Sequence, residues 1–328
     1  MTLIDRYNRI HDYLRISVTD RCNLHCHYCV PNGVHDCTSF DRLLSDEEIV
    51  QIVKVGAELG IRKLRLTGGE PLVRKELPQL IATLNEIDGI EDIALTTNGI
   101  FLPRYAEELK QAGLTRLNIS LDSLDEQKYK MITRNGKLKD VFSGIERALA
   151  LGFNPIKINV VLMRDYNIDE IEKFLRWTLN EKLQVRFIEY MPIGDEQSSW
   201  SKQYQSLSIV EEVASGIGAY REKDKEKFSG PANVFSFTGA KGSFGLIHPI
   251  SNDFCKSCNR LRLTADGYLK SCLFWEQELA VKSIAHSREK LVEAYHQAMI
   301  VKPENHEMGK QAYQKGIPTH RNMSAIGG

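Results

Sequence analysis

The chain has no excess charge of either sign and nothing that would suit a membrane. Its 43 Lys and Arg residues balance 43 Asp and Glu residues over 328 positions, so no global field attracts nucleic acid or an anionic lipid surface. No apolar run is long enough to span a bilayer, and the first residues lack the charged-then-apolar order of a signal peptide. We therefore expect a cytoplasmic protein with neither nucleic acid nor membrane as a partner, and any anionic ligand must be held by local cations.

Cysteines are few and odd in number, which disfavours a disulfide framework. Six of the seven fall into two triplets, Cys22, Cys26 and Cys29, then Cys255, Cys258 and Cys272. In a reducing compartment, clustered thiols are better explained as metal ligands. Cys37 belongs to neither triplet and is interpreted as a spare thiol.

Up to about residue 190, β-rich runs alternate with amphipathic segments, which is typical of repeated βα units. The expected strands are Tyr13–Val18, Lys63–Thr67, Asp92–Thr97, Arg116–Leu121, Pro155–Leu162 and Gln184–Tyr190. The expected helices are Ser45–Leu59, Asp125–Ile132, Val141–Leu151 and Asp169–Leu179. Six parallel strands with helical crossovers fit a doubly wound sheet or a full or partial barrel.

Small and polar residues follow four of these strands and help to choose between the two folds. They are Thr67–Glu70, Thr96–Asn98, Ser120–Asp122 and the pair Met191 and Pro192. In a barrel these carboxyl ends converge on one mouth, whereas a doubly wound sheet gathers only the ends beside its switch point. The pattern favours a barrel.

After residue 195 the rhythm changes, and we expect a smaller α+β region. The segments Asp195–Ser206 and Arg221–Lys227 are polar and predict a loop and a solvated turn. Strands are expected at Val234–Thr238, Phe244–Ile250 and Leu261–Leu263, with helical pieces within Glu278–Met299. Lys302–Gly328 has little periodicity. We accordingly divide the chain into domains at residues 1–220 and 221–328.

The first triplet, Cys22-x3-Cys26-x2-Cys29, follows the first strand directly. Three thiolates are one short of closing a cubane iron–sulfur cluster, so one iron stays open to a non-protein ligand. A zinc site completed by His25, His27 or His35 is the alternative.

After the second strand, Gly68-Gly69-Glu70-Pro71 exposes backbone that can hydrogen-bond a ligand's amino group. The same run also fits a tight turn in which Pro71 opens a helix.

In the second triplet, Cys255-x2-Cys258-x13-Cys272, two arginines that alternate with leucines lie between the second and third cysteines. Arg260 and Arg262 point to the same side of a strand, and each guanidinium fork can bind phosphate with two hydrogen bonds. The alternatives are solvated arginines and a zinc site with His248 as fourth ligand.

Further cations lie on strands that a barrel would aim inward. Arg15 is on the first strand, and Lys63 and Arg65 share one face of the second. Lys157 lies in the middle of a strand, where burial is costly unless it meets an anion or pairs with Glu189. Four or five cations in one cavity would suit a triphosphate.

The first triplet with Tyr28 before its last cysteine, followed by Gly-Gly-Glu-Pro, resembles the radical S-adenosylmethionine superfamily. The stretches 14–23, 185–192, 254–262 and 323–328 are similar to the GTP 3′,8-cyclase family within it. The resemblance implies a six-unit partial barrel, an α/β (β/α)6 TIM-like fold, with a C-terminal α+β domain that closes it.

The resemblance also implies the site, residue by residue. Two [4Fe–4S] clusters would be held by Cys22, Cys26 and Cys29 and by Cys255, Cys258 and Cys272. S-adenosylmethionine would be held by Tyr28, Gly69, Ser120 and Met191. The GTP site would be lined by Arg15, Arg65, Thr96, Lys157, Arg260, Leu261 and Arg262. Catalytic roles would fall to the first triplet and to Arg260, Arg262, Gly327 and Gly328, the two glycines threading a narrow channel.

The implied reaction is the first step of molybdenum cofactor biosynthesis. One electron from the first cluster splits S-adenosylmethionine into a 5′-deoxyadenosyl radical, which abstracts hydrogen from C3′ of GTP. The C3′ radical closes on guanine C8 to give 3′,8-cyclo-7,8-dihydro-GTP. The implied partners are an electron donor, a downstream enzyme that processes the product, and a second copy of the chain in a homodimer. The alternatives are a radical enzyme that modifies a peptide, and a non-catalytic iron–sulfur or zinc protein.

Overall fold

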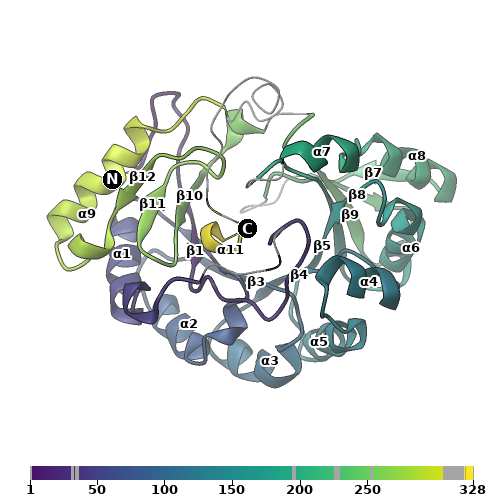
Figure 1. Ribbon diagram of the computed structural model, residues 1–328, viewed down its shortest axis with the longest axis horizontal. Coiled ribbons are helices and arrows are strands. Elements are labelled where there is room, and N and C mark those ends of the chain that lie inside the picture. The colour runs from purple at the N-terminus through teal and green to yellow at the C-terminus, as the bar shows by residue number, and fades with distance from the viewer. Residues whose placement is uncertain are drawn as a thin grey trace.

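A single curved sheet forms the centre of the protein. The structure, a computed structural model, describes residues 2–30, 33, 37–193, 197–224, 230–251, 254–305, 321 and 323–327. Over these residues the sheet has 12 strands in the order β12-β11-β10-β1-β2-β3-β4-β5-β6-β9-β8-β7. The sheet curves into an arc that does not close, with helices along its outer side (Figure 1). This is a partial barrel, as expected from the sequence.

Six parallel strands make the middle of the arc, each paired with the next along the chain. They are β1 (Tyr13–Ser17), β2 (Lys63–Thr67), β3 (Asp92–Thr97), β4 (Arg116–Ser120), β5 (Ile156–Leu162) and β6 (Gln184–Glu189). The crossover helices are α1 (Asp46–Glu58), α2 (Leu77–Asn85), α3 (Leu102–Gln111), α4 (Glu126–Thr133), α5 (Leu138–Ala150) and α6 (Ile171–Asn180). All six predicted strands and all four predicted helices are confirmed; α2 and α3 were not predicted.

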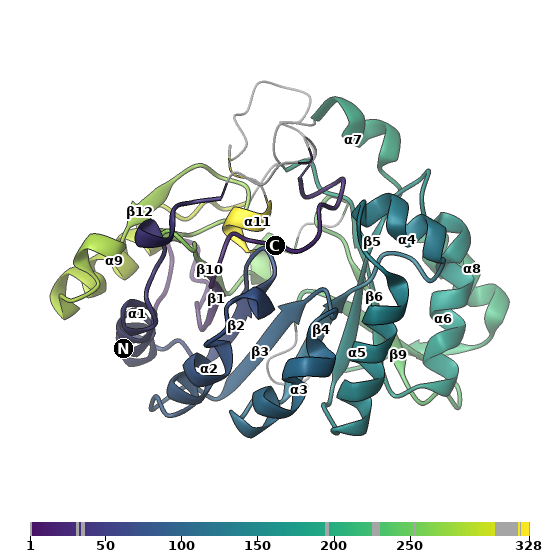
Figure 2. The ribbon, with the colours of Figure 1, turned by 60° about the horizontal axis from the view of Figure 1, so that its bottom comes forward.

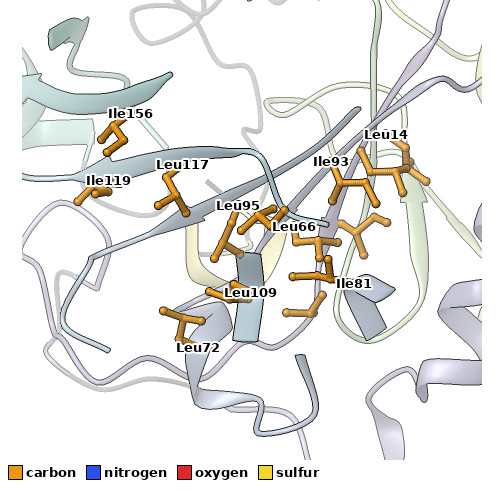
Figure 3. Close-up of a cluster of buried hydrophobic side chains, with 14 of the residues drawn as sticks. Leu14, Leu66, Leu72, Ile81, Ile93, Leu95, Leu109, Leu117, Ile119 and Ile156 are labelled. Atoms are coloured by element: carbon orange, nitrogen blue, oxygen red, sulfur yellow. The ribbon is translucent and has the colours of Figure 1, made fainter. Parts of the chain in front are cut away.

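Alternation along each strand separates a packed outer face from a polar inner face. Leu14 and Leu66 point outward into the core beneath the helices, as do Leu95 and Leu117 (Figure 3). Each such fully buried aliphatic side chain contributes about 1.5–3 kcal/mol to folding. The residues between them therefore face the inside of the arc. Figure 2 shows the crossover helices α1 to α6 along the outer face.

The later part of the chain extends both edges of the same sheet. On one side β9 (Ser243–Ile247) pairs in parallel with β6, followed by β8 (Asn233–Phe237) and β7 (Tyr220–Glu222). On the other side β10 (Arg260–Leu263) pairs in parallel with β1, followed by β11 (Tyr268–Lys270) and β12 (Glu278–Ala280). The division at residue 220 stays a prediction, and the sheet runs across it.

Among the described residues, four helices accompany these edge strands. They are α7 (Gln197–Gln203), α8 (Ser208–Ile217), α9 (Arg288–Ile300) and α11 (Met323–Ile326). The short α11 lies inside the arc in both views (Figures 1 and 2). In the described part of the chain, no helix combines the length and the apolarity needed to cross a membrane.

Two sequence predictions for this region were wrong in part. The expected loop Asp195–Ser206 contains α7, because the buried Trp200 packs on Tyr204 and donates a hydrogen bond to the Tyr190 carbonyl at 2.7 Å. In the expected turn Arg221–Lys227, the first two residues belong to β7, an edge strand on which charged side chains remain solvated; residues 225–229 lie outside the described part.

The prediction of helical pieces within Glu278–Met299 is confirmed by α9, which follows the strand β12. The helix starts only at Arg288, where the Ser287 side chain accepts a hydrogen bond from the Lys290 amide. A side-chain cap of this kind satisfies one of the first backbone donors of a helix, and it fixes the start of α9.

Candidate active site

The inner face of the arc surrounds a cavity of about 280 Å³. Its wall contains the cysteines of both triplets. It also contains most of the other predicted site residues, namely Arg15, Tyr28, Arg65, Gly69, Thr96, Ser120, Met191, Arg260 and Arg262. Lys157 and Leu261 are not part of the described wall. The Leu261 side chain lies in the hydrophobic core, because it alternates with the two inward-facing arginines.

The first triplet lies in the loop that leaves the carboxyl end of β1. The Cys29 amide donates to the Cys26 carbonyl at 3.0 Å, and the Leu24 amide donates to the Cys22 sulfur at 3.4 Å. Burial raises the pKa of Cys22 to about 12 and that of Cys29 to about 11. Metal ligation at these thiols therefore displaces protons.

The donor set fits a cluster better than a single ion. No three His, Cys, Asp or Glu side chains in the described ranges converge as one metal ion requires. Zinc would hold every sulfur at about 2.3 Å from one point, whereas a four-iron cluster offers a separate iron to each cysteine. Of the histidines proposed to complete a zinc site, His27 contacts the Arg134 guanidinium at 3.1 Å, and His35 lies outside the described residues.

The Gly-Gly-Glu-Pro turn is joined to the loop of the first triplet. The Gly69 amide donates to the Thr19 carbonyl and the Glu70 amide to the Arg21 carbonyl, both at 2.8 Å. A Cβ on Gly69 would lie 2.4 Å from the Arg21 carbonyl oxygen, so only glycine fits this approach. Pro71 begins a short 3-10 helix, Pro71–Val73. The interpretation as a tight turn in which Pro71 opens a helix is therefore compatible with the interpretation as exposed backbone for a ligand.

Two buried carboxylates brace the same end of the cavity. The Glu70 side chain accepts hydrogen bonds from the Thr97 hydroxyl and the Asn98 amide, both at 2.7 Å. Asp122 accepts one from the Tyr28 hydroxyl at 2.8 Å. Burial raises the pKa of Glu70 to about 7 and that of Asp122 to about 6. These contacts fix the predicted cofactor-binding Tyr28 in the wall.

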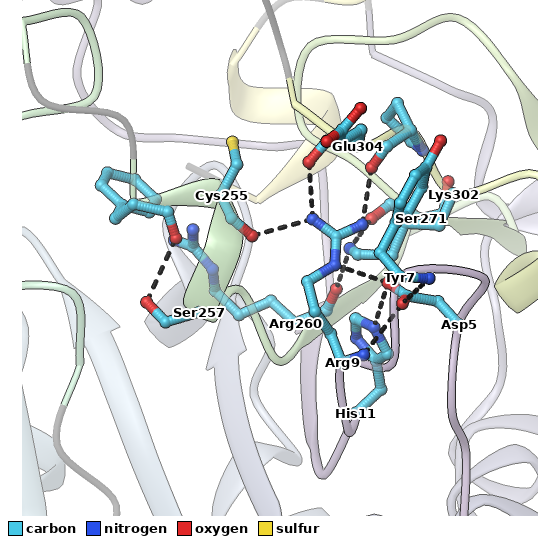
Figure 4. Close-up of polar contacts among 12 residues, drawn as sticks. Asp5, Tyr7, Arg9, His11, Cys255, Ser257, Arg260, Ser271, Lys302 and Glu304 are labelled. Carbon is cyan, nitrogen blue, oxygen red and sulfur yellow. Dashed lines mark hydrogen bonds and ion pairs between the residues drawn. The ribbon is translucent and has the colours of Figure 1, made fainter.

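The second triplet lies at the other end of the strands, just before β10 and just after β11. Arg9 reaches from the start of the chain and donates to the Cys255 carbonyl at 2.8 Å and to the Glu304 carbonyl at 2.7 Å (Figure 4). Its guanidinium also pairs with buried Asp5 at 2.6 Å, and His11 contacts the same carboxylate at 3.0 Å. Segments far apart in sequence thus hold the backbone of Cys255.

Two basic side chains lie close to the thiols of this triplet. Lys302 donates to the Arg260 carbonyl at 3.0 Å and also to the Ser271 carbonyl. Burial of the Cys258 thiol raises its pKa, but the charges of Arg260 and Lys302 outweigh burial and lower the pKa to about 6. Such a thiol loses its proton readily, which favours metal ligation.

His248 has partners other than the cysteines. Its Nδ1 lies 3.2 Å from the Ser251 hydroxyl and 3.7 Å from the Glu189 carboxylate. Glu189 in turn accepts hydrogen bonds from the Ser251 hydroxyl at 2.6 Å and the Ile250 amide at 2.8 Å. The structure therefore supports neither a zinc-ligand role for His248 nor an ion pair between Glu189 and Lys157.

Cations gather in the half of the barrel away from the first triplet. Arg15, Arg65, Lys157 and Arg186 form no ion pair with a carboxylate in the described part of the chain. Burial, together with the charge of Arg186, lowers the pKa of Lys157 to about 6. Arg65 and Arg186 are buried, and Arg15 and Lys157 are half-buried. Basic groups so close together repel one another, so an anionic ligand would stabilise this arrangement.

Arg186 was not predicted as a site residue. It lies on the inner face of β6 and donates to the Asn118 and Asn159 side-chain oxygens, both at 2.6 Å. The signal was present in the sequence, since Arg186 alternates with Val185 and Phe187 in a predicted parallel strand, as Lys157 does in its own.

The segment 323–327 enters the cavity region and contacts both ends of the site. Arg262 donates to the Gly327 carbonyl at 2.5 Å and to the Ile326 carbonyl at 3.2 Å, and the Ser324 backbone hydrogen-bonds the Cys29 thiol. Gly327 has a φ of +67°, and a Cβ there would lie 2.5 Å from Thr67. A glycine is therefore required at this position, while Gly328 lies outside the described residues.

The fold and the two cysteine triplets define a radical S-adenosylmethionine enzyme. A model of the radical SAM superfamily matches residues 16–178, and a model named Molybdenum Cofactor Synthesis C matches residues 183–308. The chain belongs to the GTP 3′,8-cyclase family: it is 47% identical over 330 residues to a GTP 3′,8-cyclase of Listeria welshimeri and 46% identical over 329 residues to that of Limosilactobacillus fermentum, covering 99% of both chains in each case. Its cofactors are S-adenosylmethionine and [4Fe–4S] clusters.

Solved structures support the fold. The structure of Streptococcus suis SuiB bound to precursor peptide SuiA superposes with a TM-score of 0.62 at 13% identity, covering 89% of this chain and 68% of that chain. Native anSMEcpe with bound AdoMet gives a TM-score of 0.56 at 15% identity, covering 92% and 84%. At this identity the likeness concerns the partial barrel alone. The full-length relatives favour neither the peptide-modifying nor the non-catalytic alternative.

Proposed function

We propose that this chain converts GTP to 3′,8-cyclo-7,8-dihydro-GTP, the first step of molybdenum cofactor biosynthesis. The observation that carries the proposal is a group of buried polar atoms in the cavity wall that lack any hydrogen-bond partner in the described residues. They are the Tyr13 hydroxyl, the Nε atoms of Arg15, Arg65 and Arg186, and the Thr96 hydroxyl. Leaving such groups unsatisfied costs about 1–3 kcal/mol each, and a ligand with several anionic oxygens satisfies them together.

In this proposal the carboxyl ends of the strands hold the radical-generating half of the site. Cys22, Cys26 and Cys29 bind the first cluster, and Tyr28, Gly69, Ser120 and Met191 bind S-adenosylmethionine. When bound, the cluster and S-adenosylmethionine supply the carbon radical that removes hydrogen from C3′ of the nucleotide. The protein keeps this end dry and rigid through the buried contacts of Glu70 and Asp122, so that a reactive group meets only its target.

The opposite half holds the nucleotide between two anchors. Arg15, Arg65, Lys157 and Arg186 bind the triphosphate, and Cys255, Cys258 and Cys272 hold a second cluster beside the guanine base. Two anchors restrict rotation of the ribose and keep C3′ within about 3–3.5 Å of the reacting carbon. Leu261 contributes through its backbone, since its side chain is in the core.

The glycine tail and its arginine complete the proposed site. Arg262 holds the Ile326 and Gly327 carbonyls, which presents the tail to both cofactor and substrate. An electron donor, a downstream enzyme that accepts the cyclised nucleotide, a homodimeric assembly and a cytoplasmic location remain parts of the proposal.

The decisive experiment measures 5′-deoxyadenosine under anaerobic conditions from the reconstituted chain, S-adenosylmethionine and a strong reductant, with and without GTP. We expect cleavage that depends on GTP, together with conversion of GTP into a cyclised product. Cleavage indifferent to GTP would leave a radical enzyme with another substrate. No cleavage, with zinc in place of about eight irons per chain, would refute the proposal.

A further inference from the structure

Tyr13 is a buried tyrosine for which neither the sequence motifs nor the family resemblance provides a role. It is the first residue of β1, is 2% exposed, and lies in the cavity wall. Its ring faces the inner side of the arc together with Arg15, while Leu14 between them faces the core. A tyrosine at such a position normally finds a partner for its hydroxyl.

The surroundings of the ring are almost entirely cationic. The Lys63 ammonium lies 4.6 Å from the ring centroid, and the guanidinium carbons of Arg65 and Arg15 lie at 5.6 and 5.7 Å. Within the described residues the hydroxyl itself makes no properly aligned hydrogen bond, although Arg15 reaches toward it. Cations can only donate hydrogen bonds, so they offer no acceptor for the phenol proton.

The register of the strands sets the level of this group in the barrel. Tyr13 pairs with Lys63 on β2 and with Arg260 on β10, so all three stand at the amino ends of their strands. Strand β1 ends at Ser17, four residues beyond Tyr13, or about 13 Å away at 3.3 Å per residue, and the first triplet follows that end. Tyr13 thus belongs to the half of the cavity that collects the cations and not to the radical-generating half.

From this geometry we propose that Tyr13 is a substrate-binding residue whose phenol donates a hydrogen bond to a phosphate oxygen of the nucleotide triphosphate. The inference rests on the proposed function and adds to it a neutral donor among the cations. A phosphate oxygen is the acceptor that the phenol lacks, and it is drawn to the same place by Lys63, Arg65 and Arg15. The phenol then fixes the direction of the phosphate chain, which point charges alone do not.

Proton linkage gives this role a signature. Burial of the phenol raises its pKa, but the charges of Arg15, Arg65 and Lys63 outweigh burial and lower the pKa to about 7. A bound phosphate chain places negative charge beside the phenol, favours its neutral form and raises the pKa again. At pH 8, GTP binding therefore takes up protons at Tyr13 in addition to those taken up by the lysines.

Other charged groups face the phenol and must be counted in this linkage. They are Arg15 on β1, Lys63 and Arg65 on β2, Arg186 on β6, and Arg260 and Arg262 on β10. The arginines stay protonated at pH 8. Burial lowers the pKa of Lys63 to about 7, so Lys63 takes up protons in the wild type and in a Tyr13 variant alike.

The test compares Tyr13→Phe with the wild-type holoenzyme, both anaerobic with clusters and S-adenosylmethionine bound. Phenylalanine keeps the ring and removes only the hydroxyl. We expect GTP affinity to fall about ten- to hundredfold, as for loss of a hydrogen bond to a charged group, and guanosine affinity to stay unchanged. Calorimetry at pH 8 in two buffers of different ionisation enthalpy should show fewer protons taken up by the variant. Iron content and circular dichroism identify any loss of folding.

Tyr295→Phe is the matched control. Its hydroxyl is also buried, but it donates to the Ile52 carbonyl at 3.0 Å, between α9 and α1 and outside the cavity. This variant should bind GTP as the wild type does. Unchanged GTP affinity in Tyr13→Phe would overturn the inference, and so would an equal loss for guanosine, which would move the phenol to the base or ribose. A wild type that binds no GTP would overturn the proposed function as well.

Discussion

Replacing Arg9 by alanine tests whether the start of the chain holds the second triplet in place. The Arg9 guanidinium is 8% exposed and donates to the Asp5 carboxylate and to the Cys255, Pro303 and Glu304 carbonyls at 2.6–2.8 Å. The variant leaves Asp5 buried without its main counter-charge and three carbonyls without a donor. Breaking a buried ion pair costs about 3–5 kcal/mol, so we expect a loss of stability of that size.

Equilibrium unfolding in urea measures this cost, provided that the slope with denaturant is unchanged. Arg147→Ala is the matched control, because its pair with Glu107 is at the surface, with the two side chains 42% and 60% exposed. Exposed pairs contribute about 0–1 kcal/mol. Arg9→Lys keeps the charge but not the fork, and should fall between the two.

Iron content separates a local effect from a global one. Because Arg9 binds the backbone of Cys255 but nothing in the first triplet, we expect Arg9→Ala to lose iron from the second site while the first keeps about four irons. If the free energy of unfolding of Arg9→Ala lies within about 1 kcal/mol of the wild-type value and its iron content is complete, Arg9 does not hold the second triplet in place.

Three further predictions concern stability at low pH, the glycine at position 327 and the cation Lys157. The pKa of Asp5 is lowered to about 2 from its usual 3.8, so the ionised carboxylate contributes about 2 kcal/mol to the free energy of unfolding. This contribution is present above pH 4 and is lost as the pH falls toward 2. The urea midpoint of the wild type should fall over this range, and that of Asp5→Asn should not. Gly327→Val puts a side chain at φ +67° and against Thr67, and product analysis should show no cyclised nucleotide although iron content is normal. Lys157→Met should weaken GTP binding at least tenfold in a binding titration, yet not lower the melting temperature, because the half-buried Lys157 side chain has no carboxylate partner within the described residues. Normal GTP affinity would exclude Lys157 from the site.

The six central strands were predictable because their pattern is local. Leu14 and Ile16 alternate with Arg15 and Ser17. Such alternation can be recognised within a few residues and does not depend on contacts with distant parts of the chain. The helices α2 and α3 were not predicted; each is short and carries a proline in its first turn, Pro78 and Pro103, and a proline weakens a local helix signal although the first turn tolerates it.

The residues of the site likewise fall into a group that the sequence predicts and a group that it does not. The two cysteine triplets and the Gly-Gly-Glu-Pro turn are contiguous motifs, and the structure brings them to one cavity as expected. Tyr13 was missed because its role depends on the curvature of the sheet, which places it among cations of other strands. Arg186 had a local signal, its alternation with Val185 and Phe187, which the prediction did not use. The hydrogen bond from Arg262 to the Gly327 carbonyl joins segments 65 residues apart, and no local sequence pattern predicts it.

The strand order of the sheet also bears on how the chain assembles. Strands β1 and β6 are the outer strands of the central six, and their partners β10 and β9 come from the last third of the chain. On the ribosome both edges therefore stay open while about fifty further residues are made, and open edges invite pairing with other chains. The pairing of Tyr13 with Arg260 closes a loop of about three quarters of the chain, and such long-range pairing is slow to form. Because Cys255, Cys258 and Cys272 flank these final strands, the wall of the pocket is complete only once they have paired, and we expect the second cluster to be enclosed only then.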